Sequence, residues 1–447
     1  MENSRKSKSA DLSEWVAKQL SPMLPPHSAV LVGLSGGVDS VVLLHLLYRL
    51  APNFSWRISA LHIHHGISPN ADAWANFCAA LCAGLGIPLS IERVDIAPLR
   101  EHGIEAAARK LRHAAFGRQS CDFIALAHHA DDQAETLLLQ LLRGAGVRGA
   151  AAMPLLATAR PGGASLVRPL LSCSRREILD YAAVHRLHWI EDESNEDERY
   201  PRNFLRHRVL PLLQERFPAC RETLSRGAQH FAEAIGLLDE LAQQDGAPAI
   251  QTVWLDVLLL RTLSPPRARN VVRYYLHRCG APMPQAAQLG DILSQLCDAR
   301  RDAAVCVNFG GWQIRRYQDR AYALPALGGF DRDLVAIWRG ETELEWPALR
   351  TRLKLARVQG AGISAEKLRA MPVTLRLRNG SVSLRPHAQA ATRSLKNLLQ
   401  EHRIPPWQRE RLPLLYCGNE LVCVPGVATA ATYQAGPHEA GILLSLE

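Results

Sequence analysis

Ala29-Val-Leu-Val-Gly-Leu34 is followed at once by Ser35-Gly36-Gly37-Val38-Asp39-Ser40, and the two segments together indicate the class of fold. The first six residues form an apolar run typical of a buried strand, and the pattern from Asp39 to Leu50 is typical of a helix. Two glycines at such a turn let the backbone approach an anion closely, and the first N–H groups of the helix point toward it. The sequence therefore predicts a phosphate site between a strand and a helix.

The phosphate-binding turn differs from the Walker loop of kinases and GTPases. It has no Gly-Lys-Ser/Thr, so the lysine that contacts the outer phosphates of ATP or GTP in those proteins is missing. A glycine turn with a Ser or Asp helix cap is the purely structural alternative, and the position of the turn between strand and helix argues against it.

The unit of strand and helix recurs along the first half of the chain. Strands are expected at 58–63, 87–94 and 121–127, and helices at 70–85, 104–119 and 132–143. Strands that alternate with helices of this length indicate βαβ crossovers and a parallel sheet covered on both faces. We expect an α/β fold with a doubly wound parallel sheet in residues 1–217.

The remainder of the chain changes character twice. Residues 191–198 are mostly acidic and predict a mobile surface loop, and residues 203–217 predict a helix that closes the first domain. Leu and Ala at helical spacing predict a mainly helical middle domain, 218–330, with a short strand at 304–308. Alternating strands and one helix predict a small α+β C-terminal domain, 350–440.

Composition limits the classes of protein to which the chain can belong. The 447 residues contain no uncharged apolar run of eighteen or so, and the polar, basic segment 1–10 is not followed by an apolar core. We therefore expect no membrane segment and a cytoplasmic location. Ten cysteines without Cys-x-x-Cys spacing indicate reduced thiols, and no structural metal is predicted. The sequence does not define the oligomeric state, and a homodimer stays open.

Positive charge gathers near the C-terminal end. The formal net charge is +9, and residues 373–411 hold eight Arg or Lys against Glu401 and Glu410. A surface of this kind is suited to a polyanion such as RNA, although a solvated charged face is the alternative reading.

Ser35 to Ser40 resembles the pyrophosphate-binding loop of the ATP-pyrophosphatase (PP-loop) superfamily, and further motifs resemble the tRNA(Ile)-lysidine synthase family in order and spacing. These motifs are His62-Ile-His-His-Gly66, Glu105-Ala-Ala-Ala-Arg109-Lys-Leu-Arg112, Ala127-His128-His129-Ala-Asp131-Asp132-Gln-Ala-Glu135-Thr136 and Arg199-Tyr-Pro-Arg202-Asn203-Phe-Leu-Arg206. Residues 393–400, 404–409 and 424–426 resemble that family's last domain. The resemblance covers nearly the whole chain and is least specific in the middle domain.

The resemblance implies the reaction. Members of the family use ATP to adenylate the C2 oxygen of the wobble cytidine in the CAU anticodon of tRNA(Ile), and release pyrophosphate. Free L-lysine then displaces AMP, which forms lysidine and changes the codon read from AUG to AUA. It implies that Ser35, Gly36, Gly37, Val38, Asp39 and Ser40 hold the pyrophosphate part of ATP, that Mg²⁺ accompanies it, and that Asp39 is a candidate metal ligand.

The substrate lysine is a cation, which calls for acidic partners. Asp132 and Glu135 lie one helical turn apart at the edge of the sheet where ligands of such folds bind, and are candidates to hold the lysine or accept its proton. Arg109 and Arg112 are candidates to pair with the lysine carboxylate or with phosphates. The alternative for such acids is a surface role at a helix N-terminus.

Other candidates concern RNA and nucleotide. His129 is expected to contact a base or cap a helix, because adjacent histidines suit zinc poorly. His62 either contacts the nucleotide or is a strand end. The resemblance places Arg202, Asn203 and Arg206 near the anticodon, and Arg393, Lys396 and Arg409 are expected to bind tRNA phosphates.

Two rival functions follow from the same residues. An ATP-dependent tRNA thiolase on this fold would need a cysteine pair near the site, and Cys78 and Cys121 do not have that spacing. An RNA-binding module without turnover is the other alternative, and the complete phosphate-binding turn with its acid pair argues against it.

Overall fold

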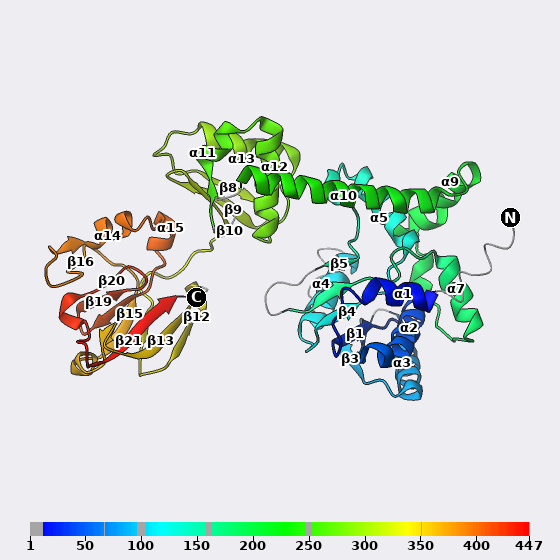
Figure 1. Cartoon of the computed structure of the whole chain (residues 1–447), viewed down its shortest axis with the longest axis horizontal. Helices are drawn as coiled ribbons and strands as arrows, with labels where there is room; N and C mark the ends of the chain where they lie inside the picture. The colour runs from blue at the N-terminus through cyan, green and yellow to red at the C-terminus, as the bar shows by residue number, and fades with distance from the viewer. Residues whose placement is uncertain are drawn as a thin grey trace. The chain divides into compact units, whose positions relative to one another are not determined.

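The computed structural model describes residues 12–66, 68–95, 104–157, 163–246, 253–349 and 351–446, so segment 1–10 lies outside the described residues (Figure 1). The chain forms two compact units, Met1–Asp239 and Glu240–Glu447. The finer division at residues 217 and 330–350 stays a prediction.

The first unit is built on a six-stranded sheet with the order β3-β2-β1-β4-β6-β5. Its strands are β1 (Ala29–Gly33), β2 (Arg57–His64), β3 (Leu89–Arg93), β4 (Phe123–Ala125), β5 (Leu156–Ala157) and β6 (Ser165–Val167). All neighbours pair in parallel except the edge strand β5, which runs antiparallel to β6. The predicted doubly wound α/β fold is confirmed. Because chain order reverses between β1 and β4, the carboxyl ends of these two strands form the crevice where such sheets bind ligands.

Alternating side chains of β1 serve opposite faces of the sheet. Val30 and Val32 pack with helices α1 (Leu12–Leu20), α2 (Val38–Phe54), α3 (Ala71–Leu85) and α7 (Arg175–Val184). Leu31, from the same strand, packs on the other face with Ala115 and Phe116 of α4 (Ile104–Gly117). Burial on both faces explains why β1 is a continuous apolar run rather than an alternating one.

The remaining helices of the first unit lie in its C-terminal half. They are α5 (Ala130–Leu142), the short α6 (Val147–Ala150), the 3₁₀ turn η2 (Glu193–Glu196), α8 (Pro201–Phe204), the π-helical η3 (Leu205–Val209), α9 (Leu210–Arg216) and α10 (Cys220–Gly246), which continues into the second unit. The expected helix 203–217 is thus a succession of three segments, and α5 begins two residues earlier than expected.

The second unit begins with helices α11 (Val257–Thr262), α12 (Pro265–Arg278) and α13 (Ala286–Asp298), as the Leu and Ala spacing predicts. They pack on an antiparallel sheet, β7-β10-β9-β8, of strands Leu255–Asp256, Arg320–Pro325, Trp312–Tyr317 and Cys306–Phe309. The sequence pattern indicated only the last of these strands.

Two antiparallel sheets and a hairpin form the C-terminal part of the second unit. One sheet, β11-β15-β18-β19-β20, consists of Val335–Ile337, Val373–Arg376, Leu414–Cys417, Glu420–Val424 and Ala428–Thr429. The other, β12-β13-β21-β14, consists of Glu343–Trp346, Thr351–Gln359, Ala440–Leu446 and Ile363–Ser364. The hairpin is β16 (Ser383–Leu384) with β17 (Arg393–Ser394), and the short helical segments are η4 (Pro347–Leu349), η5 (Lys367–Ala370), α14 (Leu395–Glu401), α15 (Pro406–Arg409) and η6 (Ala431–Tyr433). The predicted α+β character is confirmed.

Two general expectations can be compared with the structure. No helix in the described part of the chain has the length and apolar character needed to cross a bilayer. All ten cysteines have free thiols.

Candidate functional site

The turn after β1 is organised by the hydroxyl group of Ser40. Ser40 Oγ accepts hydrogen bonds from the backbone N–H groups of Ser35 (3.2 Å) and Gly36 (3.1 Å), and donates to the carbonyl oxygen of Gly37 (2.9 Å). The first turn of α2 follows, where the N–H groups of Val38, Asp39 and Ser40 have no intrahelical acceptor. The turn therefore presents several backbone donors in a small space.

Gly36 has no room for a side chain. Its φ of +93° is rarely adopted by other residues, and an added Cβ atom would lie 2.5 Å from Ile190 Cδ1 and 3.3 Å from Cys78 Sγ. The backbone N–H of Ile190 also donates to the carbonyl oxygen of Gly36 over 3.0 Å. The close approach of these residues fixes the shape of the turn.

A cavity of about 310 Å³ opens beside this turn at the carboxyl ends of β1, β2 and β4. It is lined by Gly33, Leu34, Ser35, Asp39, Ser40, Leu61, His62, Ile63, His65, Trp74, Arg112, Phe116, Leu126, Ala127, His128 and Asp192. Apolar and aromatic walls beside a set of phosphate-binding donors suit a nucleotide, whose base is flat and whose phosphates are charged.

Histidines of this cavity are held neutral. Burial lowers the pKa of His128 to about 4, and burial together with the positive charge of Arg112 does the same for His65. Burial also lowers the pKa of His62, whose Nδ1 donates to the carbonyl oxygen of Leu34 over 2.9 Å. Neutral imidazole rings are able to face a nucleobase without adding charge.

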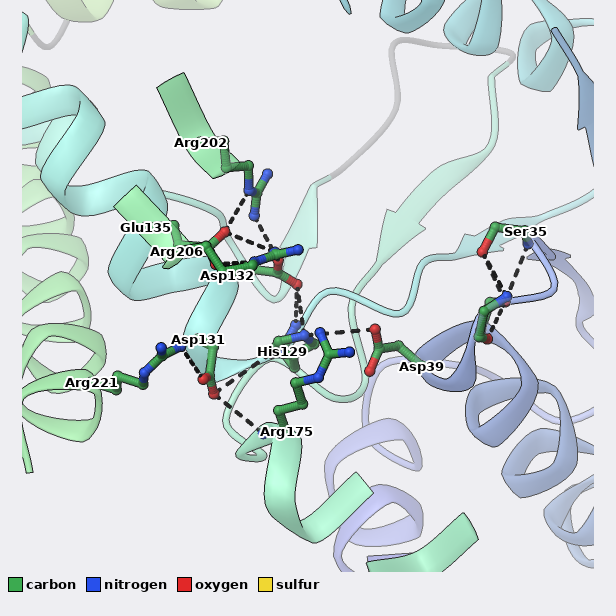
Figure 2. Close-up of polar contacts among 12 residues, drawn as sticks. Ser35, Asp39, His129, Asp131, Asp132, Glu135, Arg175, Arg202, Arg206 and Arg221 are labelled. Atoms are coloured by element: carbon green, nitrogen blue, oxygen red, sulfur yellow. Dashed lines mark hydrogen bonds and ion pairs between the residues drawn. The ribbon is translucent and has the colours of Figure 1, made fainter. Parts of the chain in front are cut away.

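A cluster of ion pairs lies next to the turn (Figure 2). Glu135 has no exposed surface, and its two oxygens accept from Arg206 Nε and Arg202 Nε, both over 2.6 Å. Asp132 Oδ1 accepts from Nη2 of Arg202 (2.7 Å) and of Arg206 (3.3 Å). The two acids that the sequence predicts as lysine-binding are therefore already paired with the two arginines predicted to approach the anticodon.

Asp132 also caps its own helix. Its Oδ2 accepts from the backbone N–H of His129 over 3.0 Å. Burial alone would raise the pKa of Asp132, but the electrostatic effects of His129 and Arg202 outweigh burial and lower that pKa to about 2. Asp132 is therefore ionised at neutral pH.

His129 connects the ion-pair cluster to the phosphate-binding turn. Its side chain is 2% exposed, and Nε2 lies 3.5 Å from Asp132 Oδ2 and 3.8 Å from Asp39 Oδ2. Figure 2 shows the ring between these two carboxylates. His129 thus occupies the N-cap position of α5 and also points toward Asp39.

Asp39 lacks a strong partner. Its Oδ1 is buried without a hydrogen bond, and burial raises the pKa of the carboxyl group despite the opposing electrostatic effect of nearby His129. A buried carboxylate oxygen without a donor is a suitable ligand for a hard cation. No group of three His, Cys, Asp or Glu side chains that could hold a metal occurs within the described ranges. Asp39 thus fits Mg²⁺ only if the phosphates of a nucleotide and water complete the coordination.

The other candidates of the first unit are placed differently from one another. Arg112 lines the cavity, whereas Arg109 does not and instead lowers, together with burial, the pKa of Arg168. Asn203 Nδ2 donates to the carbonyl oxygen of Asp197 over 3.0 Å and so holds the acidic segment. The pairing of Arg109 with the lysine carboxylate or with phosphates, and the place of Asn203 near the anticodon, stay predictions.

The three C-terminal candidates are not alike either. Lys396 is exposed, and Arg393 pairs with Glu401 over 2.6 Å. Arg409 is half-buried: Nη2 donates to Tyr317 Oη over 2.7 Å and Nε donates to the carbonyl oxygen of Ile404 over 2.6 Å. Arg409 therefore has an internal role, which the sequence prediction of a phosphate contact did not include.

Several residues of the site were missed by the sequence reasoning. Asp131 accepts from the backbone N–H of Arg175 (3.2 Å) and from Arg221 Nη1 (2.5 Å), and so joins α5 to α7 and α10. Trp74, Phe116 and Asp192 line the cavity. The position of Asp131 directly beside Asp132 was a signal in the sequence that could have identified it. The single aromatic residues Trp74 in α3 and Phe116 in α4 gave no such signal.

Sequence families match three parts of the chain. Residues 9–213 match the PP-loop domain, residues 255–322 match the TilS substrate binding domain, and residues 373–446 match the TilS substrate C-terminal domain. Together the three matches cover most of both compact units.

Relatives match the chain over its whole length. A tRNA(Ile)-lysidine synthase of Nitrosomonas europaea is 41% identical over 446 residues, which are 100% of this chain and 97% of the relative. One from Aromatoleum aromaticum is 44% identical over 420 residues, 94% of this chain and 97% of the relative. Among solved structures, the U34-tRNA thiolase NcsA of Methanococcus maripaludis has a TM-score of 0.44 at 19% identity and covers 51% of this chain and 81% of its own. That likeness is too weak to carry a conclusion.

Proposed function

The chain belongs to the tRNA(Ile)-lysidine synthases, and from this premise we propose how its residues carry out the reaction. It is an ATP-dependent ligase that forms lysidine on tRNA(Ile). In our proposal it joins free L-lysine to C2 of the wobble cytidine of the CAU anticodon through an adenylated cytidine, with release of pyrophosphate and then AMP. The full-length relatives are lysidine synthases, and none of our observations favours the thiolase alternative.

The observation that carries the proposal is the turn from Ser35 to Ser40 beside the 310 Å³ cavity. We place the two outer phosphates of ATP at the first turn of α2 and the adenine against the apolar wall of the cavity. Ser40 Oγ would release the N–H groups of Ser35 and Gly36 to the phosphates, because a phosphate oxygen is the stronger acceptor. The α-phosphate would then face the RNA base.

Mg²⁺ would be held by Asp39 together with ATP oxygens, and when bound it would neutralise charge on the departing pyrophosphate. The unpartnered Oδ1 of Asp39 supports this assignment. His129 would keep Asp39 and Asp132 apart and orient both, because its Nε2 lies within 3.8 Å of each carboxylate.

Lysine would enter at Asp132 rather than at Glu135. Both oxygens of Glu135 accept short hydrogen bonds from arginines. Asp132 Oδ1 accepts from the Nη2 groups of the same two arginines, so each arginine would keep Glu135 as a partner if it lost Asp132. An incoming ammonium group could displace Arg202 from Asp132 without leaving either charge buried and unpaired. The ionised Asp132 would then hold the ammonium group of the lysine.

RNA binding would involve both units. Lys396 and Arg393 are the exposed C-terminal candidates for phosphate contacts, and Arg112 is the candidate closest to the reacting nucleotide. We expect the reaction to take place in the cytoplasm, where ATP, lysine and tRNA occur together, and a homodimer stays open.

The test is a reaction of the purified full chain with ATP, labelled lysine and unmodified tRNA(Ile). We expect label in the RNA and one AMP and one pyrophosphate for each lysine incorporated. Formation of ADP instead of AMP, or ATP-dependent incorporation of sulfur instead of lysine, would refute the proposal.

A further inference from the structure

A second cavity lies in the C-terminal part of the second unit, apart from the residues assigned above. Its volume is about 480 Å³, larger than that of the cavity beside the phosphate-binding turn. It opens where β13 and β21 of one sheet, the segment 338–342 and the segment 365–373 come together. Nothing in the proposed reaction uses this cavity.

The floor of the cavity is apolar. Leu355, Leu368, Val373 and Ile442 are buried and belong to the core cluster of this part of the chain. Trp338 also lines the cavity, and its indole N–H donates to the carbonyl oxygen of Glu341 over 2.8 Å, which fixes the ring. A fixed aromatic side chain beside an apolar floor suits a flat, hydrophobic group.

The rim of the cavity is positively charged. Arg339, Arg357 and Arg369 line it, all three are exposed, and none forms an ion pair with an acidic side chain of the described residues. The one carboxylate of the lining is Glu341, which already accepts from the backbone N–H of Arg339 over 2.6 Å. Arg352, on the same strand as Arg357 but outside the cavity, instead pairs with Glu345 over 2.6 Å.

The chemistry of floor and rim identifies the class of ligand. Guanidinium groups bind phosphate, and an apolar floor with a tryptophan binds a base whose faces are free. A base within a helix is stacked on both faces, so only an unpaired nucleotide can present a free base and a phosphate at the same place.

We propose that this cavity binds an unpaired nucleotide from the single-stranded 3′ end of the substrate tRNA. The base would lie on the apolar floor next to Trp338, with backbone phosphates at Arg339, Arg357 and Arg369. The anticodon loop is unpaired as well, but the proposed reaction places it at the cavity of the first unit, which leaves the single-stranded 3′ end as the occupant of this second cavity. This inference rests on the proposed function, since it takes the RNA substrate from it.

The first test compares two forms of unmodified tRNA(Ile), one complete and one without its unpaired 3′ nucleotides. With the full-chain protein, we expect removal of these nucleotides to raise the dissociation constant at least about tenfold. The triple variant R339Q/R357Q/R369Q should lose about the same factor of affinity for complete tRNA. It should lose no further affinity when the tRNA is shortened. For the triple variant, the slope of the logarithm of the tRNA binding constant against the logarithm of salt concentration should be less steep by about two. About 0.7 is expected for each single-strand phosphate contact that is lost.

Two further variants separate the cavity from general effects. Arg352→Gln removes the same charge from the same strand outside the cavity, and should bind both RNAs like the parent. Ala440→Trp keeps all three arginines but fills the cavity from its exposed rim, and should reproduce the loss seen in the triple variant. Melting curves identify any variant that fails to fold. Comparison of complete and shortened tRNA with the unaltered protein tests the dependence on the 3′ nucleotides without any substitution.

Three outcomes would overturn the inference. The triple variant could bind complete tRNA as tightly as Arg352→Gln does. Alternatively, the loss of affinity caused by the triple substitution and the loss caused by shortening the tRNA could multiply when the two are combined. Free AMP could also bind the unaltered protein in equilibrium dialysis and lose that binding in the triple variant while tRNA affinity is unchanged, which would make the cavity an effector site. Lysine incorporation is measured separately at saturating tRNA, so a failed reaction with retained 3′ dependence would refute the proposed function and leave the cavity assignment standing.

Discussion

Arg206 donates from Nε to the fully buried carboxylate of Glu135 over 2.6 Å, although 71 positions separate the two residues. The pair joins α5, which follows the central strand β4, to the π-helical segment η3. π-Helical turns often occur at functional sites, and this one carries Arg206 one turn after Arg202 in α8, so that both arginines reach one carboxylate. The acidic side of the site is therefore assembled by contacts between distant parts of the first unit.

Substitution of Glu135 should destabilise the first unit more than substitution of either arginine. Glu135→Gln leaves two guanidinium groups partly buried beside a neutral amide, whereas Arg206→Gln leaves Glu135 paired with Arg202. Breaking a buried pair of this kind costs about 3–5 kcal/mol. A double-mutant cycle on thermal unfolding should show coupling of about 1–3 kcal/mol between positions 135 and 206. Additive effects would mean that the pair is not formed in solution.

Asp39→Asn should abolish pyrophosphate release without lowering the unfolding temperature. Burial raises the pKa of Asp39, so the ionised carboxylate opposes folding at neutral pH, and an uncharged amide of the same shape removes that cost. We expect an unfolding temperature equal to or above that of the parent, together with a loss of activity of at least about a hundredfold. Affinity for tRNA should be unchanged. A clear fall in unfolding temperature would show that Asp39 has a structural role.

Gly36→Ala and Gly37→Ala form a matched pair. An alanine Cβ at position 36 would lie 2.5 Å from Ile190 on a backbone with φ of +93°, whereas at position 37 its nearest contact would be Ser35 Oγ at 3.6 Å. We expect Gly36→Ala to eliminate ATP binding, measured by calorimetry, and Gly37→Ala to retain it with a smaller loss. Adding Ile190→Ala should restore part of the binding, because it removes the clash but not the strain. Equal effects at both positions would argue against this account.

The sequence was sufficient to predict the turn after β1 and the acid pair of α5, because all their parts are local. Ser35 to Ser40 lie between a strand and a helix, and Asp132 and Glu135 lie on one turn of a helix, so their geometry follows from secondary structure alone. The pairing of Glu135 with Arg202 and Arg206 could not be predicted, because it depends on how α5 and α8 pack across about 70 residues.

The same limit applies to the second unit. Alternating and helical patterns predicted its helices and its C-terminal strands, but strands β7, β9 and β10 were missed, two of them rich in charged or aromatic residues. Arg409 looked like an RNA contact because it lies in a basic segment, and only the folded chain shows that its guanidinium group faces Tyr317. The pattern of charge along a sequence does not distinguish an arginine that is exposed to solvent from one whose guanidinium group contacts other residues of the protein.

Stability should depend on pH through His45. Burial first, then the charges of His185 and Arg49, lowers its pKa to about 4. The unfolded chain takes up this proton below about pH 6.5 and the folded protein only below about 4, so stability is greatest above pH 6.5 and falls as the pH drops toward 4. The difference in unfolding free energy between parent and His45→Gln should change across this window by on the order of 1 kcal/mol. Parallel stability curves for the two proteins would contradict the assignment.

Arg409→Gln and Lys396→Gln should separate a structural arginine from an RNA-binding lysine. Besides its two hydrogen bonds, the Arg409 guanidinium lies 5.4 Å from the centre of the Tyr317 ring, and Trp407 packs edge-on against Tyr322 at 5.6 Å. Loss of charged hydrogen bonds here should cost about 2 kcal/mol, or about 4 to 8 °C in unfolding temperature for a unit of this size. Lys396 has no such contacts, so Lys396→Gln should leave the unfolding temperature unchanged, weaken tRNA binding a few-fold and lower its salt slope by about 0.7 to 0.9.

Tyr317→Phe supplies the decisive control for Arg409. It removes the acceptor of one Arg409 hydrogen bond but no charge, so it should lower the unfolding temperature and leave the salt slope of tRNA binding unchanged. In the double variant with Arg409→Gln the two losses should not add, because both remove the same contact. If Arg409→Gln instead reduces the salt slope as Lys396→Gln does and leaves the unfolding temperature unchanged, then Arg409 faces RNA phosphate, and the contact with Tyr317 is not maintained in solution.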